Sequence, residues 1–125
     1  MASIPPNVRN AWEDRDGPAI LATVSEDGIP NIIYVGSVSI FGEDRFVVAD
    51  NYFDKTRRNI RGGCKGALLF LDKKGKSYQV KGAFEYHEDG EIFVHMKAVN
   101  PPKHPGHAAA ALYVEEVYSG AERLC

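Results

Sequence analysis

The sequence predicts a mainly β protein folded as a small antiparallel barrel with short helices. Its 125 residues are the length of one domain, so residues 1–125 are expected to share a single core. Strand-like runs recur at spacings of roughly 8–12 residues and are separated by turn signals, which favours a barrel over a parallel sheet. The six runs are residues 19–24, 29–40, 45–50, 65–71, 77–87 and 111–118.

The first three runs, AILATV, IPNIIYVGSVSI and RFVVAD, are joined by the short turn sequences SEDG and FGED. Hairpin spacing of this kind predicts an antiparallel meander. Pro30 lies near the start of the second run, and proline within sheets is confined to strand starts and edges. The later run SYQVKGAFEYH alternates well enough between two faces to predict another strand.

Helix signals occur at three places. Ser3 is a suitable N-cap for a short N-terminal helix. Asp54 as N-cap and a Gly-Gly pair as stop signal predict about two turns of helix over residues 55–61. Apolar residues spaced by four and then three positions favour a third short helix over residues 91–99.

Composition and charge argue against several broad classes. Fifteen lysines and arginines face seventeen aspartates and glutamates, so the net charge of −2 gives no case for nucleic-acid binding. The N-terminus lacks a signal-peptide pattern, and no apolar run approaches the roughly 20 residues of a membrane span. Cys64 and Cys125 lack C-x-x-C spacing, which predicts reduced thiols in a cytoplasmic protein.

The stretch NYFDKTRRNIRGGCKG, residues 51–66, concentrates five cations with only Asp54 against them. A helix N-terminus attracts anions because its unpaired N–H groups point outward and the helix dipole adds partial positive charge. Lys55 would add a point charge there and Thr56 a hydroxyl donor, a pair that suits a phosphate monoester. The alternative is an ordinary solvated basic face on a surface helix.

The strand end VVAD leads directly into this basic helix. A flat aromatic ligand lying along the strand would therefore reach the helix start with a phosphate tail, in a largely apolar pocket with a few polar groups. Tyr34, Tyr52 and Trp12 are aromatic candidates for lining its ring. Ordinary core packing is the alternative for all three, and for Trp12 core packing or a dimer contact is favoured.

Other candidate chemistries have weaker support. His104 and His107 form an H-x-x-H pattern in a Pro-rich loop, but two histidines fall short of the usual zinc ligand set, so no metal site is predicted. A loop near the dimer cleft is the simpler interpretation. Cys64 has the basic neighbours that a reactive cysteine needs, although entry to a buried strand is its simpler role. The sequence has no G-x-S-x-G or G-x-G-x-x-G motif, and no side chain stands out as catalytic.

Four segments, taken in order, resemble the flavin-binding split barrels related to pyridoxamine 5'-phosphate oxidase. They are AILATVSEDGIPNIIYV, RFVVADNYFDKTRRNI, KGALLFLDKKGKSYQVKGAFEY and a strand ending VEEVYSG, and together they cover residues 18–120. Each segment alone is a weak signal, whereas their order, their spacing and the run FVVADNYFDKT are fairly specific to the family. The resemblance implies a six-stranded Greek-key split barrel that forms a homodimer, with FMN in two clefts at the dimer interface.

The resemblance also implies particular cofactor contacts. The family's phosphate-binding helix start falls on Lys55 and Thr56. Gln79 falls near a polar family position that faces the flavin ring. The family's flavin-contacting strand positions, which act largely through backbone atoms, fall on Ile33, Tyr34, Val35, Val48, Ala49 and Asp50.

Two departures argue against pyridoxamine phosphate oxidase activity itself. Where those oxidases carry an arginine and a lysine that grip the FMN phosphate, this sequence has Tyr34 and Ser39. The sequence also ends at Cys125, without the longer C-terminal segment that holds the vitamin's own phosphate in those oxidases. The resemblance is therefore closer to the small single-domain FMN-binding and flavin-reductase-like members.

The resulting prediction is an FMN-dependent flavin reductase or electron-transfer protein whose reductant comes from outside, because the cofactor carries the chemistry. The alternative is a binding module without turnover, for FMN or for another planar cofactor. A deazaflavin would need room and cations for a phosphodiester tail, which Arg57 and Arg58 would supply. A haem would need an axial histidine facing the cleft, and the sequence indicates none.

Overall fold

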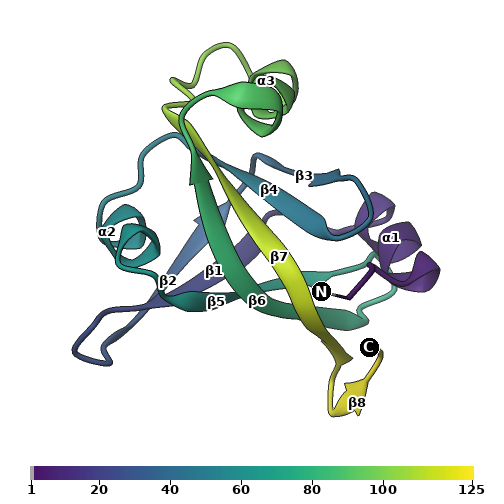
Figure 1. Cartoon of the computed structure of the whole chain (residues 1–125). Coiled ribbons are helices and arrows are strands. Elements are labelled where there is room, and N and C mark those ends of the chain that lie inside the picture. Colours follow the sequence, from purple (N-terminus) through teal and green to yellow (C-terminus); the bar gives the residue numbers. More distant parts are fainter. Residues whose placement is uncertain (1) are drawn as a thin grey trace.

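The computed structural model describes residues 2–125, and all eight of their strands join one antiparallel sheet (Figure 1). The strand order is β2-β1-β5-β6-β7-β4-β3, and β8 pairs with the end of β7. Three short helices lie around the sheet. The elements are α1 (Pro6–Glu13), β1 (Ala19–Val24), β2 (Pro30–Val35), β3 (Val38–Phe41), β4 (Arg45–Asp50), α2 (Lys55–Arg61), β5 (Lys65–Leu71), β6 (Ser77–His87), α3 (Gly90–Val99), β7 (Ala108–Ser119) and β8 (Glu122–Arg123).

The two edge strands of the sheet, β2 and β3, follow each other directly in the chain. Only Gly36 and Ser37 separate them, so the sheet must curl until its two edges meet at this link. The result is the partly open barrel of Figure 1, with the long strands β6 and β7 crossing its middle. The register of β6 shifts between Lys81 and Gly82, where a Cβ on Gly82 would lie 1.6 Å from the carbonyl oxygen of Tyr113. Only glycine fits this close approach.

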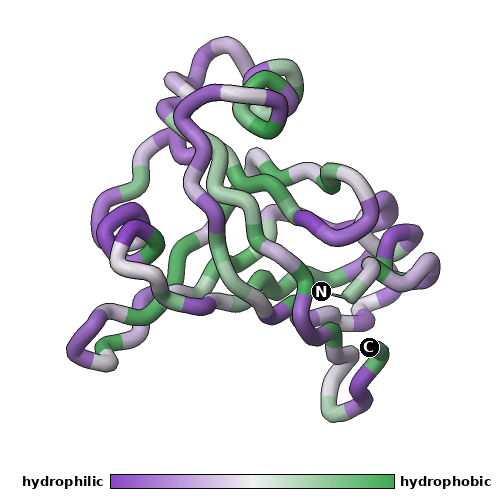
Figure 2. Tube along the Cα trace, in the orientation of Figure 1, coloured by the Kyte–Doolittle hydropathy of each residue, from purple (hydrophilic) through white to green (hydrophobic). Residues whose placement is uncertain are grey.

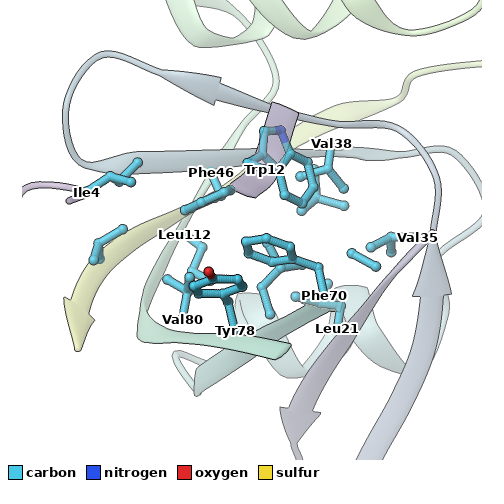
Figure 3. Close-up of a cluster of buried hydrophobic side chains, with 14 of the residues drawn as sticks. Ile4, Trp12, Leu21, Val35, Val38, Phe46, Phe70, Tyr78, Val80 and Leu112 are labelled. Carbon is cyan, nitrogen blue, oxygen red and sulfur yellow. The ribbon is translucent and has the colours of Figure 1, made fainter. Parts of the chain in front are cut away.

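Aromatic side chains fill the centre of the barrel (Figure 3). The Trp12 ring packs edge-on against Phe46 at a centroid distance of 5.3 Å and against Phe70 at 4.9 Å. Tyr78 stacks on Phe70 at 5.3 Å. Each such pair adds about 0.5–1.5 kcal/mol beyond the apolar area it buries. The expected core packing of Trp12 is therefore confirmed.

Two helices cover different ends of the strands. Helix α2 lies beside β1, where the Asn59 side-chain amide donates to the Thr23 hydroxyl at 3.1 Å. Helix α3 covers the ends of β4 and β7, where Ile92 and Met96 pack on Val47 in a second, smaller apolar cluster. Figure 2 shows hydrophobic residues along the middle of the sheet and hydrophilic residues at the outer turns.

The sequence predicted most elements well. Strands β1, β4, β5 and β6 and helix α2 have the predicted bounds, and α3 begins one residue earlier than predicted, at Gly90. Asp54 is the N-cap residue of α2 as predicted, although its side chain makes no cap hydrogen bond. The predicted Ser3 cap is wrong, because Pro5 is the N-cap of α1. No helix within residues 2–125 is long and apolar enough to cross a membrane.

The predicted count of six strands is corrected to eight. The run 29–40 is two strands, because its first half pairs with β1 and its second half pairs with β4 at the other edge of the sheet. The predicted three-strand meander is therefore two separate hairpins. The last long strand begins at Ala108, earlier than predicted, because its alanines pair with both β4 and β6. The two-residue strand β8 had no sequence signal.

Candidate cofactor site

A pocket of about 570 Å³ opens where β2 and β4 end and the loop after α3 folds back over them. This volume lies within the range of small-molecule sites. Four of the nine predicted contact residues line the pocket, namely Ile33, Tyr34, Val35 and Ala49. The structure thus brings together the two strand segments that the sequence assigned to one site.

The lining of this pocket suits a planar ligand that is neutral or negatively charged. Tyr34 and Tyr52 line it with exposed aromatic rings, as proposed from the sequence for both residues. Lys103 is a cation at its rim, and the described side chains of the lining include no carboxylate. An apolar wall with few polar groups is typical of sites that hold a ring and orient it by its edges.

Strand β4 forms the closed wall of the pocket. It pairs with β3 on one side and β7 on the other, and Val48, Ala49 and Asp50 are all buried. The amide of Ala49 donates to the Ser37 carbonyl at 3.0 Å, and the Asp50 carbonyl accepts from the His107 amide at 2.8 Å. These two main-chain atoms are therefore already bonded within the chain, and backbone contacts to a ligand would have to use other atoms of the segment.

The side chain of Asp50 is 0% exposed and collects donors from three parts of the chain. Arg57 donates through Nε at 2.7 Å to one carboxylate oxygen and through Nη2 at 2.9 Å to the other. The Tyr86 hydroxyl donates at 2.5 Å, and the Phe53 amide donates at 3.1 Å. Bidentate arginine pairs and charge-assisted bonds of this kind are the stronger hydrogen bonds of proteins. Asp50 thus ties together the end of β4, helix α2 and strand β6.

The charge state of this cluster follows from its contacts. Burial raises the pKa of Asp50, but the hydrogen bonds from Arg57, Tyr86 and Phe53 outweigh burial and hold the pKa below its usual value. The same bond to Asp50 raises the pKa of Arg57. Burial and the bond to Asp50 raise the pKa of Tyr86. Asp50 and Arg57 are therefore both charged at neutral pH, and Arg57 is already paired.

The loop that covers the pocket is fastened to the end of β4 by two asparagines. Asn51 and Asn100 exchange side-chain amide hydrogen bonds, both at 3.0 Å. The Asn51 carbonyl oxygen also accepts from the Gly106 amide at 2.9 Å. Lys97 donates to the Pro105 carbonyl at 2.9 Å. Residues 100–106 therefore hold a fixed position over the pocket.

The H-x-x-H pattern of this loop divides between two environments. His104 lines the pocket, and its Nδ1 lies 3.1 Å from the Tyr52 hydroxyl. His107 lies outside the pocket lining and is exposed. The sequence indicated no histidine facing the cleft, and that expectation is wrong for His104. The prolines and glycine predicted a loop here, and the position of Pro101, Lys103 and His104 at the pocket agrees with the expected loop near a cleft.

Of the two predicted phosphate anchors, Lys55 lines a second groove of about 640 Å³ between α2 and the β1–β2 turn, whereas Thr56 lies outside the lining of both hollows. Lys55 is exposed and lines this groove together with Arg58 and the carboxylates Glu26 and Asp27. Thr56 is only 2% exposed, and its hydroxyl accepts from the Asn31 amide at 2.9 Å, which leaves the hydroxyl hydrogen to donate. Because α2 has only seven residues, its dipole is small, and anion binding there depends mainly on these side chains.

The β2 strand connects the pocket and the groove. Ile33, Tyr34 and Val35 line the pocket, whereas Pro30 and Asn31 line the groove. Six residues of strand span roughly 20 Å at about 3.3 Å per residue, so a ligand lying along β2 would reach from the pocket to Lys55. Lys55 and the pocket residues therefore fit one extended ligand, although the two hollows are separate.

Gln79 lies elsewhere on the same chain. It is on β6, paired with Leu69 of β5 and Tyr118 of β7. Because directly paired residues point to the same face, Gln79 belongs to a row across the outer face of the sheet that also contains Ile20 and Tyr34. Three strand spacings separate Gln79 from Tyr34, or about 14 Å. One chain therefore does not bring Gln79 to its own pocket.

The outer face that carries this row is apolar on its β2, β1 and β5 strands. Ile32 is 67% exposed and Tyr34 is 74% exposed. Val24, Leu69 and Leu71 add exposed apolar side chains to the same face. Contiguous exposed apolar surface on a folded protein marks an interaction site more often than a solvated face.

Two further positions singled out from the sequence have structural partners. The Ser39 hydroxyl lies 2.9 Å from His95 Nε2 of α3, so this position is hydrogen-bonded within the chain and lies outside the pocket lining. Cys64 is half-buried at the entry to β5 and borders the groove. The predicted structural role of Cys64 fits this position.

Sequence reasoning missed several residues that shape the site. Asn51, Phe53 and Lys103 line the pocket, and Asp50 acts through its side chain rather than only its backbone. A usable signal existed for Asp50, since a carboxylate ending a buried strand requires a buried partner. No local signal identifies Lys103, because only the fold carries its loop back to β4.

Comparison with known proteins identifies a family over nearly the whole chain. Residues 4–119 match the family described as pyridoxamine 5'-phosphate oxidase. The chain belongs to this family. A relative in Methanocaldococcus jannaschii, "Uncharacterized protein MJ0282", is 32% identical over 105 residues, which are 79% of this chain and 70% of that protein.

Solved structures show the fold of this pyridoxamine 5'-phosphate oxidase family member. HupZ of Group A Streptococcus superposes with a TM-score of 0.80 at 24% identity, over 93% of each chain. An FMN-binding protein of Syntrophomonas wolfei subsp. wolfei superposes with a TM-score of 0.78 at 21% identity, over 91% of this chain and 84% of that one. The predicted split-barrel fold and the family resemblance are both confirmed.

Proposed function

We propose that this member of the pyridoxamine 5'-phosphate oxidase family is an FMN-binding protein with a redox role, a flavin reductase or an electron carrier. The observation that carries the proposal is the pocket between β2 and β4, which joins an apolar wall, two exposed tyrosines and a cationic rim without a carboxylate. The similar FMN-binding protein of Syntrophomonas wolfei supports the choice of cofactor.

The residues present fit FMN by the chemistry of their side chains. Ile33, Val35 and Ala49 would exclude water from one side of the ring, and Tyr34 would cover its edge. Lys55 and the Thr56 hydroxyl would hold the phosphate, with Asn31 orienting that hydroxyl. Bound FMN would supply the electron transfer, while this chain supplies binding, orientation and a desolvated environment.

A second copy of the chain is the expected partner in this proposal. The exposed apolar face formed by β2, β1 and β5 borders the pocket through Tyr34, so covering that face would also close the pocket. A symmetric dimer places the same patch on both subunits. Gln79 shares the face with Tyr34, and a dimer would allow Gln79 of the partner subunit to approach the flavin ring.

The visible absorption spectrum of the purified protein tests the cofactor. Flavin bands, or saturable quenching of added FMN at a ratio of one FMN per chain, are expected. A protein that neither carries nor takes up FMN would contradict the proposal. Anaerobic mixing of the FMN-loaded protein with NADH or NADPH then separates a reductase, which bleaches the flavin, from a carrier, which does not.

A non-catalytic binding module for another planar cofactor is the second candidate. His104 lines the pocket and would supply a nitrogen ligand for a haem iron, and a haem band in the spectrum would favour this function. The groove beyond Lys55 has room for the longer tail of a deazaflavin, with Arg58 as its cation. Arg57 is not free for that tail, because it pairs with Asp50.

Pyridoxamine phosphate oxidase activity has less support from the site. Tyr34 and Ser39 supply no positive charge, and Ser39 pairs with His95 rather than lining the pocket. An assay of pyridoxamine 5'-phosphate oxidation by the FMN-loaded protein is expected to show no turnover.

A further inference from the structure

The side chains of the buried cluster of Asp50, Arg57 and Tyr86 make none of the contacts proposed above for FMN. It nevertheless joins three elements immediately behind the site, since Asp50 ends β4, Arg57 belongs to α2 and Tyr86 belongs to β6. The same carboxylate accepts from the Phe53 amide, and Phe53 lines the pocket. The segment 53–56, which contains Lys55 and Thr56, is thus bonded to this carboxylate through Phe53 at its start and through Arg57, the residue directly after it.

We propose that Asp50, Arg57 and Tyr86 are positioning residues that fix segment 53–56 and so give the site its preference for a phosphorylated flavin over the unphosphorylated one. This inference rests on the proposed function. The cluster would not touch the ligand. It would set where Lys55 and Thr56 stand before the ligand arrives.

Burial and pairing both support a positioning role over direct binding. Asp50 has no contact with solvent, and both of its oxygens are used by Arg57. Arg57 lines neither the pocket nor the groove, whereas Lys55 lines the groove. Arg57 is therefore paired with Asp50 and does not face a ligand, whereas Lys55 of the same helix is exposed.

Positioning matters more for the phosphate than for the ring. The ring wall comes from β2 and β4, whose positions are set by sheet pairing, whereas the anchors come from a seven-residue helix beside the sheet. Immobilising one flexible side chain at binding costs about 0.5–1.5 kcal/mol. A looser segment 53–56 would therefore weaken binding of FMN while leaving riboflavin, which lacks the phosphate, nearly unaffected.

The test is titration of the full chain with FMN and with riboflavin, by flavin fluorescence. The variants are Asp50→Asn, Arg57→Lys and Tyr86→Phe, each of which keeps the side-chain size close to the original. The expected result is a fall of roughly three- to tenfold in the FMN-to-riboflavin affinity ratio for Asp50→Asn and Arg57→Lys, and a smaller fall for Tyr86→Phe. Arg45→Lys is the matched control, because Arg45 also contacts a tyrosine and an aspartate but lies at the opposite end of β4. Its ratio is expected to be unchanged.

Three outcomes would overturn the inference. If the variants weaken both ligands equally, or lower the melting temperature with an unchanged ratio, the cluster supports the fold alone. If only the Arg57 variant changes the ratio, Arg57 is a direct phosphate ligand and the positioning role is wrong.

Amide relaxation of the ligand-free protein keeps this inference separate from the proposed function. Tyr86→Phe and Arg57→Lys are expected to lower the backbone order parameters of Lys55 and Thr56 from about 0.85 toward 0.6, with no change in Arg45→Lys. Unchanged order parameters would contradict the positioning role. Failure of the wild-type protein to bind either flavin would instead remove the proposed function, and the claimed phosphate preference with it.

Discussion

Strands β4 and β2 border the same pocket but differ in strand pairing and in burial. β4 has a partner on each side, and its last five residues are buried. β2 is an edge strand with β1 as its partner, and its outward residues Ile32 and Tyr34 are exposed. The β4 wall of the pocket is thus fully paired and buried in the folded chain, whereas the β2 wall exposes apolar side chains to solvent.

This difference indicates that the two strands have different roles in the site. Strand β4 sets the position of the ring-binding surface and, through the bond between Asp50 and Arg57, the position of helix α2, which carries Lys55 and Thr56. Strand β2 exposes apolar surface, and burying that surface in a complex would stabilise the complex by about 25 cal/mol for each Å² removed from water. Substitutions in β4 should therefore act on folding, and substitutions in β2 should act on association and ligand binding.

The largest expected effect is on β4. Phe46→Ala should lower the free energy of unfolding by about 3–5 kcal/mol, because the buried ring packs against Trp12 and leaves a cavity when removed. Ile32→Ala on β2 should change it by less than about 0.5 kcal/mol in the isolated chain. Urea denaturation measures both, and similar losses for the two variants would break the contrast between the strands.

The next effect is on association through β2. Ile32→Asp should weaken self-association by about 2 kcal/mol or more, because it places an unpaired charge in the apolar face. Val94→Asp is the matched control, since Val94 on α3 is 66% exposed but belongs to a different surface. Sedimentation velocity should show monomer for the first variant and unchanged assembly for the second. A wild-type protein that is monomeric with full FMN affinity would contradict the dimer.

A smaller effect is expected at the anchor beside β2. Lys55→Ala should weaken FMN binding by about 1–3 kcal/mol, the range for losing a hydrogen bond to a charged group. Riboflavin binding should not change, because riboflavin lacks the phosphate. Lys73→Ala, in the turn after β5, is the control. An unchanged FMN affinity in isothermal titration would reject Lys55 as the anchor.

The smallest expected effect is a pH dependence of the free energy of unfolding that comes from Asp50 at the end of β4. The folded pKa of Asp50 is below its usual value of about 3.9, so its stabilisation is complete above that pH and is lost as pH falls through the folded pKa. The stability difference between wild type and Asp50→Asn should be about 1–2 kcal/mol at pH 6 and should shrink below pH 4. A difference that stays constant down to pH 2 would show that the Asp50 charge contributes nothing.

Local patterns predicted much of this structure because they depend on neighbours in the chain. The bounds of β5, β6 and α2 followed from apolar runs, alternation and the Gly-Gly stop, since each signal acts within a few residues. The predicted strand 29–40 was wrong because its apolar residues continue through Gly36, while its two halves pair with different strands. The early start of β7 was missed because its first residues are alanines, which have a weak strand preference and become strand only through pairing with β4 and β6.

The candidate site divides in the same way. Tyr34 and Ala49 were predicted from the family resemblance, Tyr52 as an aromatic candidate and Lys55 from the basic helix start. All four border the pocket or the groove. The buried role of the Asp50 side chain and its pairing with Arg57 were not predicted, because the identity of a buried partner depends on which elements meet.

The sequence by itself determined the strands, the short helices and the family, because these depend on residue order and short-range preference. Only the tertiary structure decided that one predicted strand turns between two edges of the sheet, that Arg57 is paired inside while Lys55 faces outward, and that His104 returns to the pocket. Each of these outcomes depends on contacts between segments far apart in the chain, and those contacts are formed by the closing of the sheet.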